Sequence, residues 1–136
     1  TRTVVKGRAP EKLRRMMEAA RAAQRAALKH IRAGALAQAI HEKACAEMRR
    51  RGFPTKMVKG IPHGFIHSTG HGVGLRYHEP SPLICPGGDL LLDQGMVHSV
   101  EPGIYFPEMG GIRLEDNVVV TETGCEVLGP FGSELT

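Results

Sequence analysis

Three histidines lie within one glycine-rich segment, which reads HSTGHGVGLRYH over residues 67–78. His67 and His71 are four residues apart, and on a helix this spacing would place two metal ligands on one face. The glycines between His67 and His78 disfavour a helix, so the rings need not share a direction. Such glycines indicate a backbone that approaches another group closely or adopts positive φ. The segment predicts either a functional histidine cluster or a polar loop without function.

Two glutamates could supply carboxylates to the same site. Glu101 lies in SVEPG at the end of a predicted strand, where the Pro-Gly pair indicates a turn. Glu115 lies in GIRLED, where strand alternation places it on the same face as Arg113. A surface ion pair between these two residues would contribute little to stability. Because three valines follow at 118–120, we expect a buried strand instead, and a buried charge there requires a partner.

One imidazole and two carboxylates form a mixed nitrogen and oxygen donor set. This set suits Mn, Co, Fe or Zn better than Ca. The three cysteines, Cys45, Cys85 and Cys125, have no CxxC spacing and are expected to be reduced thiols of a cytoplasmic protein. Three ligands could hold one ion, whereas two ions about 3.5–4 Å apart would need further carboxylates. The residues alone predict a hydrolytic metal site with too few ligands for two ions.

The elements that must position these groups differ between the two halves of the chain. Apolar residues recur at helical spacing from Pro10 to Gly34 and again from Ala35 to Arg51. After Pro54, glycine and proline become frequent and the helical period disappears. Short apolar runs there predict strands at 65–66, 90–92, 96–100, 104–106 and 112–121, and residues 1–8 resemble the end of a strand. Two helices followed by antiparallel strands predict an α+β fold.

Length and charge exclude several classes of protein. The chain has 136 residues, which suits one domain, and a net charge of +4. Most basic residues fall between Arg2 and Lys59 with few aromatic residues among them, which indicates a solvated helix face and no nucleic-acid partner. The apolar runs are far shorter than the ~20 residues of a membrane span, so no membrane contact is expected.

Several ordered motifs together resemble the pita-bread metallopeptidases, which include methionine aminopeptidases, aminopeptidase P and prolidase. They are the segment from His67 to Pro82, EPGIY at 101–105, and GIRLED at 111–116 followed by VVVTETGCEVL. The RLED, HEPSP and EPGIY forms are similar to the aminopeptidase P and Xaa-Pro dipeptidase branch. The resemblance implies a truncated pita-bread fold, with two helices followed by antiparallel strands of a curved sheet. It also implies metal-dependent hydrolysis of Xaa-Pro peptide bonds.

The same resemblance implies a role for each matching residue. It assigns metal binding to His71, Glu101 and Glu115, with Glu115 bridging two divalent ions. It assigns catalysis to His67, His78 and Glu101, where Glu101 accepts a proton and His78 stabilises the tetrahedral intermediate. It assigns substrate binding to His67, His78, Tyr105 and Arg113. The expected ions are manganese, with cobalt or zinc as alternatives, and the expected substrate is a peptide with proline at its second position.

The family site also uses two aspartates that would precede the Thr1-Arg2-Thr3 segment. We therefore expect residues 1–136 to be the C-terminal portion of the catalytic domain, able to bind one ion or none and inactive alone. The intact protein is expected to be a homodimer. Two alternatives remain within the fold: a metal-free creatinase-like amidinohydrolase and a non-catalytic interaction module. The presence of His71, Glu101 and Glu115 argues against the amidinohydrolase.

Overall fold

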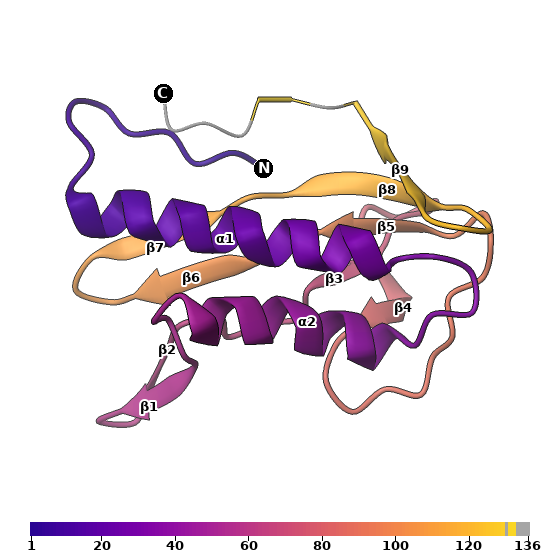
Figure 1. Ribbon diagram of the computed structural model, residues 1–136, viewed down its shortest axis with the longest axis horizontal. Helices are drawn as coiled ribbons and strands as arrows, with labels where there is room; N and C mark the ends of the chain where they lie inside the picture. Colours follow the sequence, from indigo (N-terminus) through magenta and orange to yellow (C-terminus); the bar gives the residue numbers. More distant parts are fainter. Residues whose placement is uncertain (130, 133–136) are drawn as a thin grey trace.

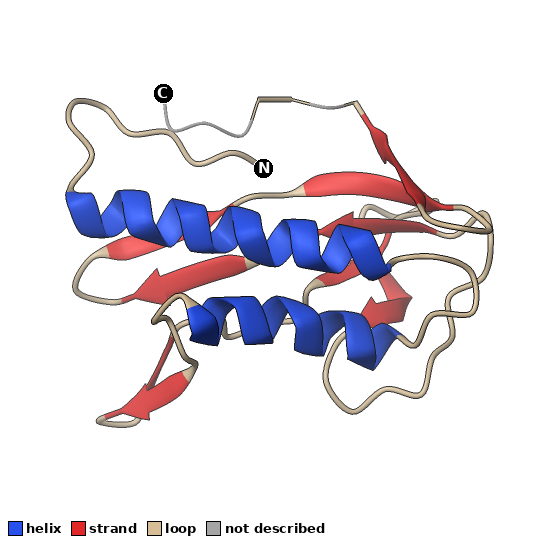
Figure 2. Cartoon of the chain, in the orientation of Figure 1, coloured by secondary structure: helices blue, strands red, loops and turns tan. Residues whose placement is uncertain are grey.

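The computed structural model describes residues 1–129, 131 and 132, apart from the side chains at 81 and 82. In this part of the chain two helices precede nine strands (Figures 1 and 2). The helices are α1 (Glu11–His30) and α2 (Ala37–Arg50). The strands are β1 (Lys56–Val58), β2 (Ile61–His63), β3 (Gly70–Gly72), β4 (Glu79–Ile84), β5 (Val97–Val100), β6 (Gly103–Phe106), β7 (Gly110–Arg113), β8 (Asp116–Val120) and β9 (Cys125–Leu128).

An antiparallel sheet of five strands, in the order β4-β3-β5-β8-β9, forms the framework of the fold. Two smaller antiparallel pairs, β1-β2 and β6-β7, complete the strand arrangement of the described residues. Strand β3 has β4 on one side and β5 on the other. Its short backbone is therefore enclosed by neighbours, which leaves little room beside it.

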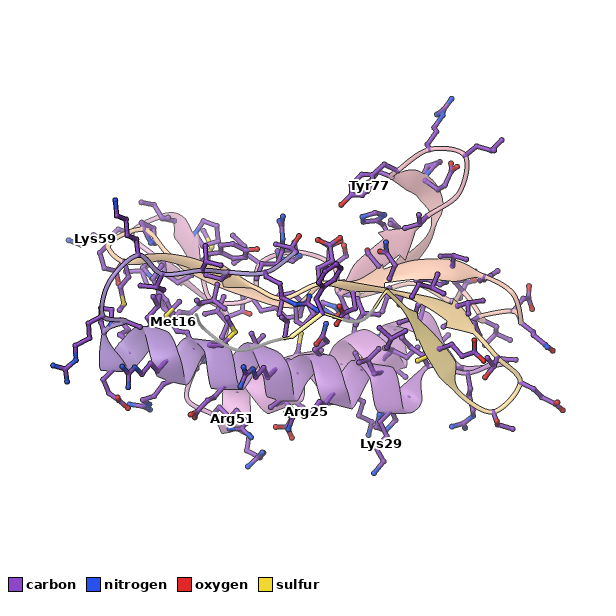
Figure 3. The ribbon with its side chains drawn as sticks, turned by 90° about the horizontal axis from the view of Figure 1, so that it is seen from above. Met16, Arg25, Lys29, Arg51, Lys59 and Tyr77 are labelled. Atoms are coloured by element: carbon purple, nitrogen blue, oxygen red, sulfur yellow. The ribbon has the colours of Figure 1, made fainter. Side chains whose placement is uncertain are left out.

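Helices α1 and α2 lie side by side and cover one face of the sheet (Figures 1 and 3). Small buried side chains on the helices, Ala19, Ala20, Ala23, Ala27, Ala37 and Ala44, permit their close approach. Larger fully buried side chains fill the space between helices and strands, among them Met16, Ile40, Met48, Ile84 and Val118. Burial of each such side chain contributes about 1.5–3 kcal/mol. No helix within the described residues is both long and apolar enough to cross a membrane.

The predicted α+β class and the antiparallel sheet are confirmed, and both helices lie within a few residues of their predicted bounds. Helix α1 stops at His30 and does not continue to Gly34. The backbone N–H groups of Ala33 and Gly34 donate to the carbonyl oxygens of Thr121 and Leu92. Tertiary hydrogen bonds therefore satisfy donors that a longer helix would have satisfied internally.

The single strand predicted over residues 112–121 is wrong. The chain forms β7 up to Arg113 and β8 from Asp116, and the two residues between them leave the ladder. The break has a topological cause, because β7 pairs with β6 whereas β8 pairs with β5 and β9. Glu115 stands in this break.

Three further strand predictions are wrong in detail. Residues 65–66 form no strand, and in the run 90–92 only Leu91 forms an isolated bridge, with Leu36. Residues 1–8 also form no strand, although the backbone of Thr1 pairs with Glu115. Strands β1 to β4 and β9 were not predicted as elements, because their short apolar content is interrupted by glycine, proline and charged residues.

Candidate metal centre

His71 lies at the centre of β3, in a segment where the sequence argued against a helix and identified no strand. Of the two reasons predicted for the glycines, close approach is the one that applies at Gly70. A Cβ atom at Gly70 would stand 1.8 Å from the carbonyl oxygen of Ser99 on β5, a distance that close-packed atoms cannot reach. Glycine therefore lets β3 pack tightly against β5, which places His71 beside the strand that leads into Glu101.

Both ring nitrogens of His71 have defined neighbours. Nδ1 lies 2.9 Å from the carbonyl oxygen of Gly72, so we assign the proton to Nδ1 as the donor of this bond. Nε2 then carries the lone pair, and it lies 3.3 Å from Oε1 of Glu101. The His71 residue is only 3% exposed. An imidazole whose Nδ1–H is fixed by a backbone carbonyl presents Nε2 as a metal ligand.

Glu101 directly follows β5 and is held by the residue two positions before it. Ser99 Oγ donates to Oε1 of Glu101 at 2.9 Å and accepts the backbone N–H of His71 at 3.0 Å. The backbone N–H of Glu101 donates to the carbonyl oxygen of Thr69 at 2.7 Å. The Thr69 hydroxyl in turn lies 2.9 Å from Nδ1 of His41 on α2. One serine hydroxyl thus links two candidate ligands, and α2 supports the same corner of the site.

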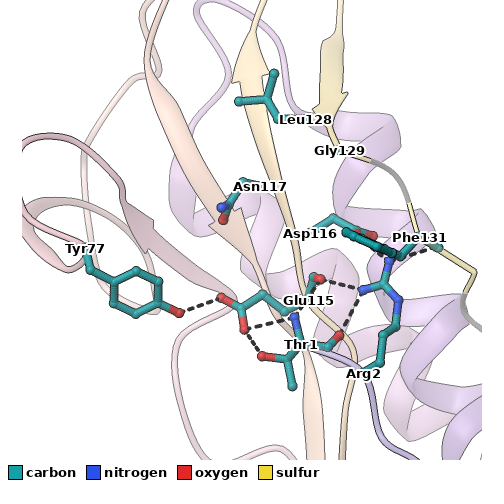
Figure 4. A pocket seen from close by; sticks show the side chains of 9 residues that line it. All are labelled: Thr1, Arg2, Tyr77, Glu115, Asp116, Asn117, Leu128, Gly129 and Phe131. Carbon is teal, nitrogen blue, oxygen red and sulfur yellow. Dashed lines mark hydrogen bonds and ion pairs between the residues drawn. The ribbon is translucent and has the colours of Figure 1, made fainter.

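Glu115 is 7% exposed, and its two carboxylate oxygens have different partners (Figure 4). Oε1 accepts the hydroxyl of Tyr77 at 3.2 Å, and Oε2 accepts the hydroxyl of Thr1. Burial raises the pKa of Glu115, but hydrogen bonds from Thr1 and Tyr77 and the charge of Arg113 act in the opposite direction, and this pKa lies below its usual value. The carboxylate is therefore ionised at neutral pH, as a metal ligand must be.

The three predicted ligands, His71, Glu101 and Glu115, converge in the structure. Each offers one ligand atom, and these atoms all lie within 4.8 Å of one another. Bonds of about 2.0–2.2 Å to a shared ion separate ligand atoms by roughly 3–4 Å, so a small side-chain adjustment would close the set. The donor set of one imidazole nitrogen and carboxylate oxygens suits a divalent transition-metal ion.

The four residues predicted to contact substrate lie around this group. Nε2 of His67 lies 3.0 Å from the hydroxyl of Tyr105, and Arg113 also interacts with Tyr105. Burial raises the pKa of Tyr105, so its phenol keeps its proton at neutral pH. The exposed ring of His78 stacks on the ring of His71, with centroids 3.7 Å apart. The structure therefore brings together the residues predicted to bind metal and substrate. Their roles stay predictions.

Three residues near the site were not identified from the sequence. Ser99 could have been found, because on a strand it shares a face with Glu101 two positions later. Tyr77 lies on a loop, where no regular alternation of side chains predicts the direction in which it points. His98 on β5 is fully buried, and neither ring nitrogen has a hydrogen-bond partner among the described residues. Burial, together with the neighbouring His71, lowers its pKa to about 4. His63, which had no predicted role, packs edge-on against Phe106 at 5.6 Å.

Comparison with known proteins agrees with the family resemblance found in the sequence. The sequence model of metallopeptidase family M24 matches residues 1–122. The Xaa-Pro dipeptidase of Pyrococcus furiosus is 39% identical over 137 residues, which cover 99% of this chain and 36% of that protein. The structure of an X-Pro aminopeptidase from Thermotoga maritima superimposes with a TM-score of 0.87 at 34% identity, over 98% of this chain and 36% of that one. An agropine synthesis cyclase of Rhizobium rhizogenes is 40% identical over 90% of this chain and 28% of that protein. The chain thus spans about a third of the length of these relatives.

Proposed function

Because the chain belongs to metallopeptidase family M24, we propose that its protein is a metal-dependent exopeptidase that hydrolyses Xaa-Pro peptide bonds. The convergence of His71, Glu101 and Glu115 within 4.8 Å is the observation that carries the proposal. Relatives named as an Xaa-Pro dipeptidase and an X-Pro aminopeptidase support the substrate class. We propose manganese as the ion, with cobalt or zinc as alternatives. A homodimer and a cytoplasmic location stay predictions.

The proposed chemistry divides between the ion and the residues around it. When bound, a divalent ion supplies Lewis acidity toward the scissile carbonyl and toward water. Glu101 is the carboxylate that we assign to accept a proton from the attacking water, since Ser99 already orients its Oε1. His78 is exposed beside His71 and could donate to the developing oxyanion. His67, Tyr105 and Arg113 would bind and orient the peptide, because their polar groups are linked to one another.

The test is hydrolysis by the protein expressed from its complete coding sequence, stripped of metal and then supplied with Mn²⁺, Co²⁺ or Zn²⁺ in turn. Ala-Pro, Ala-Pro-Ala and Ala-Ala separate a dipeptidase, an aminopeptidase and an enzyme without proline preference. We expect metal-dependent cleavage of a proline substrate, lost in Glu115→Gln. Absence of cleavage with all three ions, or equal cleavage by Glu115→Gln, would overturn the proposal.

The name of the Rhizobium relative gives a specific reason to test a second chemistry. That protein is named as a cyclase although it is 40% identical to this chain, so similarity at this level does not fix the reaction. The mixed donor set nevertheless favours the metallopeptidase over a metal-free enzyme of the same fold. If the metal-stripped protein converts an amidine or a cyclisable amide substrate and ignores peptides, the peptidase assignment is wrong.

A further inference from the structure

The loop at residues 73–78 joins β3 to β4 and rises from the face of the sheet opposite to the helices (Figure 3). Its base is held by Glu79, whose Oε1 accepts the backbone N–H of Arg76 at 2.9 Å. A Cβ atom at Gly74 would stand 2.8 Å from the same oxygen, so a side chain there would displace the Glu79 carboxylate from its present position. Beyond the base, Leu75 is fully exposed and Tyr77 is 69% exposed.

Although Tyr77 is exposed, its side chain points back to the candidate metal centre (Figure 4). Its hydroxyl donates to Oε1 of Glu115 at 3.2 Å, and its ring lies edge-on to His71 with centroids 5.6 Å apart. Tyr77 therefore contacts two of the three candidate ligands. Fixing an exposed side chain costs conformational entropy. The hydrogen bond to Glu115 and the ring contact with His71 must compensate for this cost at Tyr77.

We propose that Tyr77 is a positioning residue that orients the Glu115 carboxylate for metal binding. This inference rests on the metal centre proposed above. An ionised carboxylate has about four acceptor positions, so the bond from Tyr77 leaves room for an ion on the same group. Hydrogen bonds to a ligand from outside the coordination shell commonly change metal affinity by about 10- to 100-fold. Tyr77 thus acts on Glu115 through its hydroxyl, whereas Leu75 at the tip of the loop is fully exposed.

The experiment compares Tyr77→Phe with the wild type in the protein expressed from its complete coding sequence and stripped of metal. The substitution keeps the ring against His71 and removes only the hydroxyl. Calorimetric titration with Zn²⁺ should give a Kd about tenfold or more higher for Tyr77→Phe. The near-ultraviolet difference between the two proteins isolates the absorption of Tyr77, and it should change on addition of Zn²⁺. Because the Tyr77 ring also lies edge-on to His71, this response reports contact with the centre, and the Kd of Tyr77→Phe decides whether the hydroxyl orients Glu115.

Two controls separate this inference from the proposed function. Leu75→Ala disturbs the same loop without touching a ligand, and it should keep the wild-type Kd. Glu115→Gln removes a ligand and should weaken Zn²⁺ binding. If the wild type and Glu115→Gln both fail to bind Zn²⁺, the metal centre itself is refuted. If the wild type binds and Tyr77→Phe binds equally well or more tightly, only the role of Tyr77 is refuted.

Discussion

His98 makes the stability of the protein sensitive to acid in a way that can be calculated. Its ring is fully buried on β5, and within the part of the chain that the structure describes neither ring nitrogen has a hydrogen-bond partner. Burial lowers its pKa from 6.5 to about 4 in the folded protein. In the unfolded chain the ring titrates at its ordinary pKa, so between these two values the unfolded state binds more protons. Its contribution to stability is therefore intact above pH 6.5 and is lost as the pH falls toward 4.

The lowered pKa sets the size of the effect. Linkage gives a loss of about 2 kcal/mol between pH 7 and pH 5 and a limit of about 3 kcal/mol below pH 4. Replacement by a side chain that does not titrate, in His98→Phe or His98→Leu, should remove this part of the acid sensitivity. Both variants change the packing of the core, but that change shifts stability equally at the two pH values. The difference between pH 7 and pH 5 therefore isolates the imidazole.

Urea denaturation of the wild type and both variants at pH 7 and pH 5 measures this difference directly. A chelator in every sample excludes metal binding at His71 as a source of pH dependence. The wild type should lose about 2 kcal/mol more than either variant between the two pH values. If all three proteins lose the same amount, His98 does not titrate as a buried neutral ring, and the reasoning from its burial is wrong.

Three other perturbations probe the centre and its support. Ser99→Ala removes the hydroxyl shared by His71 and Glu101, so calorimetry should show about tenfold weaker Zn²⁺ binding, and an unchanged Kd would contradict this link. Gly70→Ala should lower the unfolding free energy by at least about 3 kcal/mol in urea, because its Cβ would meet the Ser99 carbonyl. In Gly132→Ala the added Cβ would meet no described residue within 4 Å, so this variant should stay within about 0.5 kcal/mol of the wild type. Equal effects of the two substitutions would refute the tight β3-β5 contact. Zn²⁺ at 100 times its Kd should stabilise the protein by about 2.7 kcal/mol in a thermal scan, and a shift that persists in Glu101→Gln would exclude that ligand.

The helical half was predictable because its periodicity is regular and long. Met16 and Ala20 on α1, and Ile40 and Ala44 on α2, recur at a spacing that only a helix places on one face. The sheet was harder to predict, because most of its strands have three to five residues and β5 pairs with β3 and β8, neither of which is its neighbour in the sequence. The break at Glu115 shows the limit, since residues 112–120 contain no glycine or proline to mark the point where the strand changes partners.

The residue types of the metal centre were predictable, whereas its support was not. His71, Glu101 and Glu115 stand in motifs that resemble a known family, so their convergence could be expected before any coordinates existed. Tyr77 reaches Glu115 only because a loop of six residues folds back over the sheet, and nothing local in the sequence fixes that direction.

The glycines of the histidine segment show what the structure adds to a motif. The sequence left two causes open, a close approach or a positive φ. Gly70 does not have a positive φ, and its Cβ would stand against the carbonyl oxygen of Ser99, so close approach is the cause. The same Ser99 uses its hydroxyl to hold the backbone N–H of His71 and the carboxylate of Glu101. The bond to His71 requires β3 and β5 to lie this close, because the Ser99 hydroxyl could not reach the β3 backbone if a side chain at Gly70 pushed the strands apart. The glycine therefore contributes to the metal centre through the position of its neighbours.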